Sequence, residues 1–162
     1  MQFLVLLMLL GWLGLANGAP VIATKLFGSR FAQPLDGGVS FIDGRPLFGG
    51  SKTIRGIVAS IATTGLGALV LGFELSTGAL IGATAMAGDL CSSFIQRRLN
   101  LVPGSRATGL DQIPESLLPL LACRGLFGLS LIDIVVGVAG FFIGALLLSS
   151  VFFRLGLRDR PY

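Results

Sequence analysis

The stretch "IVVGVAGFFIGALLLSSVFF", which runs from Ile134 to Phe153, decides the class of fold. It contains 20 successive residues without a charge, between Asp133 and Arg154. A helix of about 20 apolar residues crosses the hydrocarbon core of a bilayer. The stretch therefore predicts a membrane-spanning helix.

The rest of the chain is also strongly apolar. Of its 162 residues, 53% are hydrophobic and 12% are charged, and the mean hydropathy is +0.87. Four further runs predict membrane helices: Phe3–Ala16 with an extension through Ile22, Gly56–Phe73, Leu75–Ile95 interrupted by Asp89, and Ser116–Ile132 interrupted by Arg124. We therefore expect a single-domain, all-α integral membrane protein with about five transmembrane helices and a long loop between the first two.

The first apolar run could instead be a secretory signal peptide, because the small residues Ala16, Gly18 and Ala19 follow its apolar centre. A signal peptide normally carries a positive residue before that centre. The chain has none before Phe3. We therefore expect the run to be the first membrane helix.

The basic residues are distributed unevenly over the predicted loops. All except Arg124 lie in the loop between the first two helices, in the loop after the third helix, or in the tail: Lys25, Arg30, Arg45, Lys52, Arg55, Arg97, Arg98, Arg106, Arg154, Arg158 and Arg160. Positive residues mark the cytoplasmic side of a membrane protein. We therefore expect a multi-pass protein of the cell membrane, with the N-terminus outside and the long loop, the tail and the active face in the cytoplasm.

The chain contains no histidine and two cysteines. The absence of histidine excludes imidazole bases and zinc sites built from histidine. Cys91 and Cys123 lie in apolar surroundings, where cysteine usually acts as a small buried hydrophobe. Any metal or proton chemistry must therefore use carboxylates, hydroxyls and basic side chains.

A first polar cluster lies in "FIDGRPLFGGSKTIRG", from Phe41 to Gly56. Its polar side chains include Asp43, Arg45, Ser51, Lys52, Thr53 and Arg55. A glycine-rich turn before the amino end of a helix binds anions, so the cluster predicts a phosphate cradle, although its spacing is not that of a Walker A loop. The alternative is a basic loop with glycine turns, in which Ser51 or Thr53 caps the second helix.

A second polar cluster, "GDLCSSFIQRRLN", runs from Gly88 to Asn100. Helical spacing places Asp89, Ser93 and Gln96 or Arg97 on one face. An ionisable residue within a membrane span is costly and indicates a functional site. The alternative is that Asp89 forms a structural pair with an arginine between helices.

A third cluster, "GLDQIPES", runs from Gly109 to Ser116, and its acidic residues Asp111 and Glu115 lie one helical turn apart. Asp111 could be only the cap of the fourth helix. The functional interpretation is a second carboxylate that shares a magnesium ion with Asp89, because magnesium takes oxygen ligands from one or two carboxylates and from substrate phosphates. Together with the cations, this arrangement suits a nucleoside triphosphate.

The residues also resemble a known family. The stretches "NGAP" (Asn17–Pro20), "PLDGGVSFIDGRPLFGGSKTIRG" (Pro34–Gly56), "GDLCSSFIQRRLNLVPGS" (Gly88–Ser105) and "GLDQIPES" (Gly109–Ser116) are similar to those of the CDP-archaeol synthases. A more distant resemblance is to phosphatidate cytidylyltransferases. The chain departs from the archaeol-type pattern at Gln96, where a lysine is expected.

The resemblance implies that CMP passes from CTP to the phosphate of a bis-prenyl glycerol phosphate, with release of pyrophosphate. The implied partners are CTP, this isoprenoid lipid and the bilayer, without nucleic acid. The implied catalytic residues are Asp89, Asp111, Lys52, Arg97 and Arg98, and Asp89 and Asp111 would hold Mg²⁺. The implied CTP- and phosphate-binding residues are Asn17, Arg45, Ser51, Lys52, Arg55, Ser93, Arg97 and Arg98. Asp43 would bind metal or orient Arg45.

Two other functions are compatible with these residues. A cytidylyltransferase for diacyl phosphatidate would meet the same phosphate group. A small anion transporter would also use glycine-rich spans such as "TTGLGALVLG". However, a transporter is expected to place polar residues near the middle of the membrane and on both faces, whereas here they are expected mainly on one face.

Overall fold

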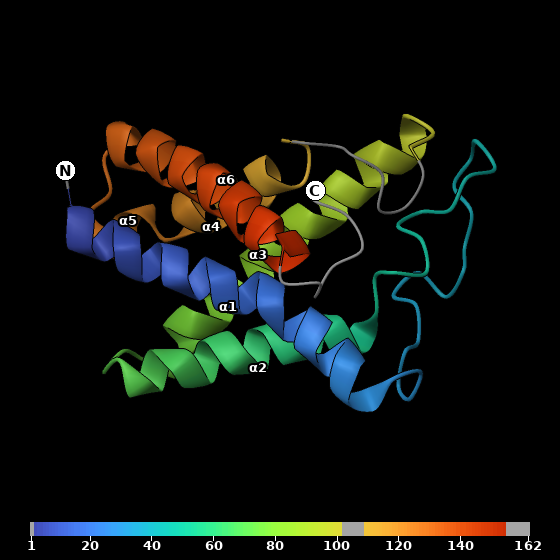
Figure 1. The fold of residues 1–162 in the computed structure, drawn as a ribbon, viewed down its shortest axis with the longest axis horizontal. Helices are drawn as coiled ribbons and strands as arrows, with labels where there is room; N and C mark the ends of the chain where they lie inside the picture. The colour runs from blue at the N-terminus through green and yellow to red at the C-terminus, as the bar shows by residue number, and fades with distance from the viewer. Residues whose placement is uncertain (1, 102–108, 155–162) are drawn as a thin grey trace.

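The computed structural model describes residues 2–101 and 109–154, and this part of the chain is helical apart from its loops and turns (Figure 1). The helices are α1 (Phe3–Phe27), α2 (Ile54–Val70), α3 (Leu75–Arg98), α4 (Gln112–Ala122), α5 (Arg124–Phe127) and α6 (Leu131–Arg154). Arg106, Arg158 and Arg160, which contributed to the expected orientation, lie outside the described residues, as does the side chain of Arg154.

Three of these helices are long and apolar enough to cross a membrane: α1, α3 and residues Leu131–Leu148 of α6. Helix α2 is apolar but shorter, at 17 residues. The expected all-helical membrane architecture is therefore present. α1 is longer than its apolar run, because it continues through Pro20 as far as Phe27.

The predicted fourth span, Ser116–Ile132, is not one helix. It is divided into α4, the four-residue α5 and the start of α6. Gly128 adopts a left-handed conformation (φ +61°), which ends α5. Ser130 and Asp133 then form a capping box, in which each side chain accepts a hydrogen bond from the backbone N–H of the other, at 3.2 and 3.0 Å. These local signals outweigh the apolar character of the run.

Helix α3 lies at the centre of the bundle and packs against α1, α2 and α4. Its glycines permit very close approach. A Cβ atom at Gly78 would lie 2.1 Å from the carbonyl oxygen of Thr64 in α2, and one at Gly82 would lie 2.3 Å from Thr64 Oγ1. A Cβ atom at Gly88 would lie 2.2 Å from the carbonyl oxygen of Pro114 in α4. Small residues at such contacts let membrane helices pack through their backbones.

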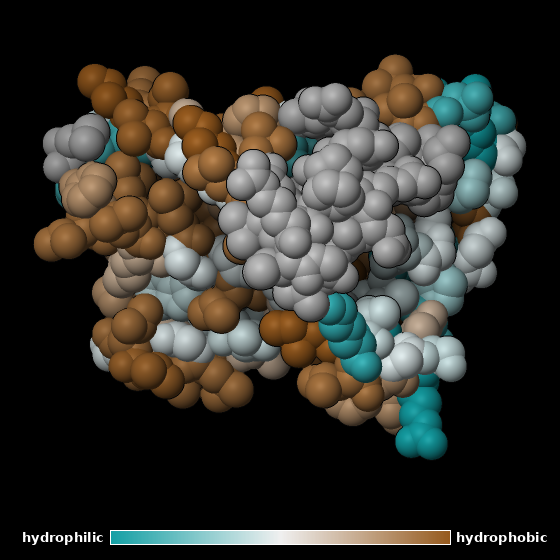
Figure 2. Space-filling view, in the orientation of Figure 1, coloured by the Kyte–Doolittle hydropathy of each residue, from teal (hydrophilic) through white to brown (hydrophobic). Residues whose placement is uncertain are grey.

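The apolar core is closed at one end of the bundle by three aromatic rings. Trp12 of α1 makes an edge contact with Phe73, at 5.4 Å between ring centres, and Phe73 makes another with Phe127, at 5.7 Å. The loop between α1 and α2 lies at the opposite end (Figure 1). Hydrophobic residues cover much of the helical surface, whereas hydrophilic residues gather at the loop end (Figure 2). The polar clusters of the sequence therefore meet at that end.

Candidate active site

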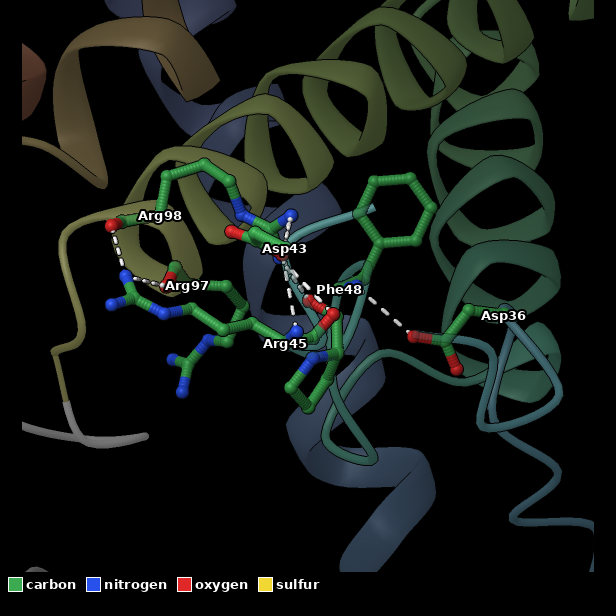
Figure 3. Close-up of polar contacts among 7 residues, drawn as sticks. Asp36, Asp43, Arg45, Phe48, Arg97 and Arg98 are labelled. Carbon is green, nitrogen blue, oxygen red and sulfur yellow. Dashed lines mark hydrogen bonds and ion pairs between the residues drawn. The ribbon is translucent and has the colours of Figure 1, made fainter. Parts of the chain in front are cut away.

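The loop between α1 and α2 is organised by the carboxylate of Asp36. One oxygen accepts a hydrogen bond from the backbone N–H group of Phe48 at 3.0 Å (Figure 3). The same oxygen accepts one from Gly49 at 3.0 Å, and the other oxygen accepts one from Gly38, also at 3.0 Å. The hydrogen bond from Phe48 and its neighbours holds the pKa of Asp36 below its ordinary value. Asp36 therefore fixes the glycine-rich turn that precedes Lys52.

Arg98, at the end of α3, holds the same loop from the other side. Its guanidinium group donates to Asp43 at 2.8 Å and to the carbonyl oxygen of Pro46 at 2.6 Å (Figure 3). It also lies 4.9 Å from the ring centres of both Phe41 and Phe94. Asp43 thus pairs with Arg98, and it also accepts a hydrogen bond from the backbone N–H of Arg45. The guanidinium of Arg98 is already occupied by the loop.

Arg45 and Arg55, two other expected phosphate ligands, also bind main-chain oxygens. The guanidinium of Arg45 donates to the carbonyl groups of Arg97 and Arg98 at the end of α3, where helix carbonyl groups lack partners within the helix (Figure 3). Arg55 donates to the carbonyl oxygens of Gly28, at 2.9 Å, and Arg30, at 2.5 Å. Both residues therefore tie the loop to helix ends.

Lys52 makes a different kind of contact. Its Nζ atom lies 2.5 Å from Oδ1 of Asp89, so the loop and the middle of the bundle are joined by an ion pair. Both side chains are mostly shielded from solvent, with relative exposures of 22% and 18%. The alternative considered for Asp89, a structural pair with an arginine, is not what the structure shows; its cationic partner is Lys52. Thr53, the next residue, caps α2 by accepting the N–H of Gly56 at 3.2 Å.

Asp111 precedes α4 and faces α3. Its carboxylate accepts a hydrogen bond from the side-chain amide of Gln96. Burial raises the pKa of Asp111 above its ordinary value, although the hydrogen bond from Gln96 opposes this effect. The charges of Lys52, Asp89 and Arg97 also act on Asp111. The two expected metal-binding carboxylates therefore share one neighbourhood. Asp111 does not cap α4 with its side chain.

Two residues in this neighbourhood were not assigned roles from the sequence. Gln96 departs from the family pattern but binds Asp111 directly. Glu115 lies near Asp89, so that the two carboxyl groups influence one another. Its position one turn after Asp111 was visible in the sequence, but its proximity to Asp89 depends on the packing of α4 against Gly88, which only the three-dimensional structure shows.

The remaining expected site residues differ in their burial and in their hydrogen-bond partners. Arg97 donates no side-chain hydrogen bond to any described residue, and its buried Nε atom lacks a partner there. Ser93 is buried on α3, with 4% exposure. Ser51 is exposed in the turn before α2. Asn17 donates to the carbonyl oxygen of Leu13 in its own helix, at 3.1 Å, and no helix break follows it. Arg97 therefore lies near the carboxylates with guanidinium donors that have no partner among the described residues.

Two apolar grooves lie between helices. The first, of about 390 Å³, is lined by Gly109, residues of α4 such as Ile113 and Leu117, and residues of α6 such as Val138 and Phe142. It begins two residues from Asp111. The second, of about 360 Å³, lies between α1 and α2 and is lined by residues that include Gly14, Gly18, Ile22 and Thr63. The first groove therefore offers an apolar surface close to Asp111 in the chain, and the second offers another between α1 and α2.

Known proteins share this fold and sequence pattern. A family model described as CarS-like CDP-archaeol synthase matches residues 3–80 and 67–162. The CDP-archaeol synthase of Thermofilum pendens is 33% identical over 154 residues, which are 91% of this chain and 75% of that protein. That of Thermococcus onnurineus is 40% identical over 109 residues, 60% of this chain and 61% of that protein.

A solved structure is also similar. It is described as an intramembrane enzyme for archaeal membrane lipid biosynthesis, has a TM-score of 0.72 and 32% sequence identity, and the match covers 86% of this chain and 89% of that one. Fold and site thus define a membrane-embedded enzyme, a CTP-dependent transferase of lipid biosynthesis. The chain belongs to the CDP-archaeol synthase family.

Proposed function

We propose that the chain transfers CMP from CTP to the phosphate of a bis-prenyl glycerol phosphate, which yields a CDP-activated ether lipid and pyrophosphate. The observation that carries the proposal is the meeting of Lys52, Asp89, Arg97 and Asp111 at one end of a membrane bundle that belongs to this family. The site includes a half-buried carboxylate on each of two chain segments, Asp89 in α3 and Asp111 before α4. It also includes one cation from the loop before α2 and one from the end of α3, and such a set suits a triphosphate with a bound metal.

The residues present fit a divalent metal, which we take to be Mg²⁺. Asp89 and Asp111 supply oxygen ligands, which this hard ion prefers. Within the described residues no group of three or more acidic or cysteine side chains forms a complete metal cage. Two carboxylates with substrate phosphates and water are therefore the fitting ligand set. When bound, the ion would neutralise charge on the triphosphate.

The protein's own part in the reaction is to position phosphates and balance their charge. The attacking lipid phosphate is already an anion, so no strong base is needed, in agreement with a chain that has no histidine. Arg97 has guanidinium N–H groups without a partner among the described residues, and these would bind phosphate oxygens. The ammonium group of Lys52, which lies beside Asp89, would supply a second cation for the phosphates. Arg45, Arg55 and Arg98 contribute by fixing the loop.

The two apolar grooves support a lipid substrate with two long chains. They lie between α4 and α6 and between α1 and α2, and their described linings consist almost wholly of apolar residues. The loop and the carboxyl end of α3 lie at one end of the bundle (Figure 1). By the distribution of basic residues, that end faces the cytoplasm, with the N-terminus outside and CTP entering from the cytoplasm.

The test is incubation of the purified protein with labelled CTP, Mg²⁺ and a lipid phosphate. Label should enter the lipid, with a preference for the bis-prenyl over the diacyl substrate. Asp89→Asn should abolish labelling while the thermal melting curve stays near that of the unchanged protein. Transfer to neither lipid would overturn the proposed function, and a preference for the diacyl lipid would overturn the proposed substrate.

A further inference from the structure

The carboxyl end of α1 carries an exposed surface outside the carboxylate site. Ala23 is the last buried residue of the helix, and residues 24–31, here called the α1 tip, are all exposed. The tip has three large hydrophobic side chains: Leu26, Phe27 and Phe31, with exposures of 73%, 50% and 76%. The α1 tip therefore presents its side chains to the surroundings of the protein rather than to the bundle.

The α1 tip is also positively charged. Its two cations, Lys25 and Arg30, are exposed, and neither takes part in an ion pair within the described residues. The first acidic residue of the sequence is Asp36, whose carboxylate is already bound by backbone N–H groups. The tip therefore presents two positive charges that no carboxylate of the described chain neutralises by an ion pair.

Arg55, at the start of α2, holds the backbone of the α1 tip. Its guanidinium group donates to the carbonyl oxygens of Gly28 and Arg30, at 2.9 and 2.5 Å, and to Oγ1 of Thr24, at 3.0 Å. Phe31 follows with a left-handed backbone (φ +58°), which is uncommon for a bulky residue. The contacts from Arg55 fix the backbone and leave the charged and apolar side chains of the tip exposed.

The length of α1 places the tip at the surface of the bilayer. The helix has 25 residues. At about 1.5 Å per residue it is about 37 Å long, whereas the hydrocarbon core of a bilayer is about 30 Å thick. The last turn of α1 therefore reaches the lipid headgroups at the end of the bundle that carries the loop (Figure 1). The groove between α1 and α2 continues to the tip, because Leu26 and Phe27 line it.

We propose that the α1 tip binds the headgroups of anionic phospholipids in the membrane leaflet at the loop end. Lys25 and Arg30 contact the lipid phosphates, because an anionic membrane surface attracts basic side chains within the headgroup region. The three large hydrophobic side chains of the tip lie at the boundary with the lipid chains. The inference concerns the lipid that surrounds the protein, and it does not depend on the reaction that the protein catalyses.

The test measures which lipids surround the tip. Phe31→Trp places a fluorescent reporter there, while the single native tryptophan, Trp12, is buried. The full-length protein is reconstituted in vesicles of phosphatidylcholine and phosphatidylglycerol in equal amounts, with quenching bromine atoms on the chains of one lipid or the other. We expect association with phosphatidylglycerol to be favoured by about 5- to 30-fold, the range for one to two basic residues near an anionic surface.

Matched variants locate this preference. In the Phe31→Trp protein, Lys25→Gln combined with Arg30→Gln should make the two lipids equally effective quenchers. Arg124→Gln removes an exposed cation from the other end of the bundle and should leave the preference unchanged. Val70→Trp places the reporter at the far end of α2, where Val70 is 85% exposed, and should show no preference for the anionic lipid.

Three results would overturn the inference. They are equal quenching by the two lipids, a preference that survives the loss of both cations, and no quenching by either lipid, since the tip would then lie clear of the bilayer. If Phe31→Trp fails to fold, Leu26→Trp serves as the reporter and the same outcomes decide. The measurement needs no substrate, so an inactive protein would count against the proposed function and not against this inference.

Discussion

The charged residues at the loop end fall into two regions that look alike in the sequence and differ in structure. In the loop-anchoring region, Arg45, Arg55 and Arg98 donate to main-chain carbonyl groups. In the carboxylate region, between α3 and α4, Lys52 meets Asp89 while the Arg97 guanidinium donates to no described residue. The comparison shows that a basic residue near a phosphate site is a candidate phosphate ligand only where its N–H groups are not already hydrogen-bonded to main-chain carbonyl groups.

Loss of a carboxylate in the carboxylate region should have the largest effect. Asp111→Asn keeps the shape of the side chain and can still accept from Gln96, but it removes the charge. We expect transfer to fall by about 1,000-fold, by analogy with the loss of a central electrostatic group, with the melting temperature maintained. Steady-state assays with labelled CTP measure the first quantity and thermal unfolding measures the second. Turnover within tenfold of wild type would remove Asp111 from the metal site.

The next largest effect should come from Arg97. Arg97→Ala removes a guanidinium that holds no described partner, so we expect a loss of about 100-fold in kcat/KM for CTP and no loss of stability. Arg45→Ala is the matched control, because it removes an arginine from the same end of the bundle. A melting temperature that falls more in Arg97→Ala than in Arg45→Ala would contradict the division into two regions.

Arg98→Ala should act mainly on stability. It removes hydrogen bonds to Asp43 and Pro46 and the contacts with two phenyl rings. Hydrogen bonds of charged groups contribute about 1.5–3 kcal/mol, so we expect unfolding to become easier by about 2 kcal/mol. Thermal unfolding in detergent measures this change. An unchanged melting temperature together with a loss of CTP affinity would instead place Arg98 among the phosphate ligands.

The smallest effect should be a pH-dependent loosening of the loop around Asp36. The folded pKa of this carboxylate lies below its ordinary value of 3.8, chiefly because of the hydrogen bond from Phe48. Its stabilisation is therefore complete above the ordinary value and is lost as the pH falls through the lower, folded value. Limited proteolysis with an acid-stable protease should cut the loop more readily in that range. Asp36→Asn should show faster cutting at neutral pH and little further change on acidification.

Much of the architecture follows from local sequence. The uncharged runs predict α2, α3 and α6 because hydrophobic length decides whether a helix can span a membrane. Asp111 is also predicted to precede the fourth helix, and α4 begins at Gln112. The division of the fourth run depends on the left-handed Gly128 and on the capping box of Ser130 with Asp133. These short-range signals are present in the sequence, but the prediction of one helix relied on the apolar composition of the run instead.

The candidate site was predicted by residue type, but the partner of each residue was not. Helical spacing on α3 predicts that Asp89 and Gln96 or Arg97 share one face of the helix, whereas nothing local indicates that Lys52 reaches Asp89 from 37 residues away. Nor can sequence show that Arg98 is already bound by the loop. Such partners depend on long-range packing, because they belong to segments that meet only when the bundle forms.

The glycines of α3 have a consequence for how a substrate could arrive. Gly78 and Gly82 are pressed against α2, and Gly88 is pressed against α4, so α3 cannot slide or turn without clashing with two neighbours at once. A lipid that diffuses in the plane of the bilayer is therefore expected to enter through the grooves beside α6 or between α1 and α2, without a movement of α3.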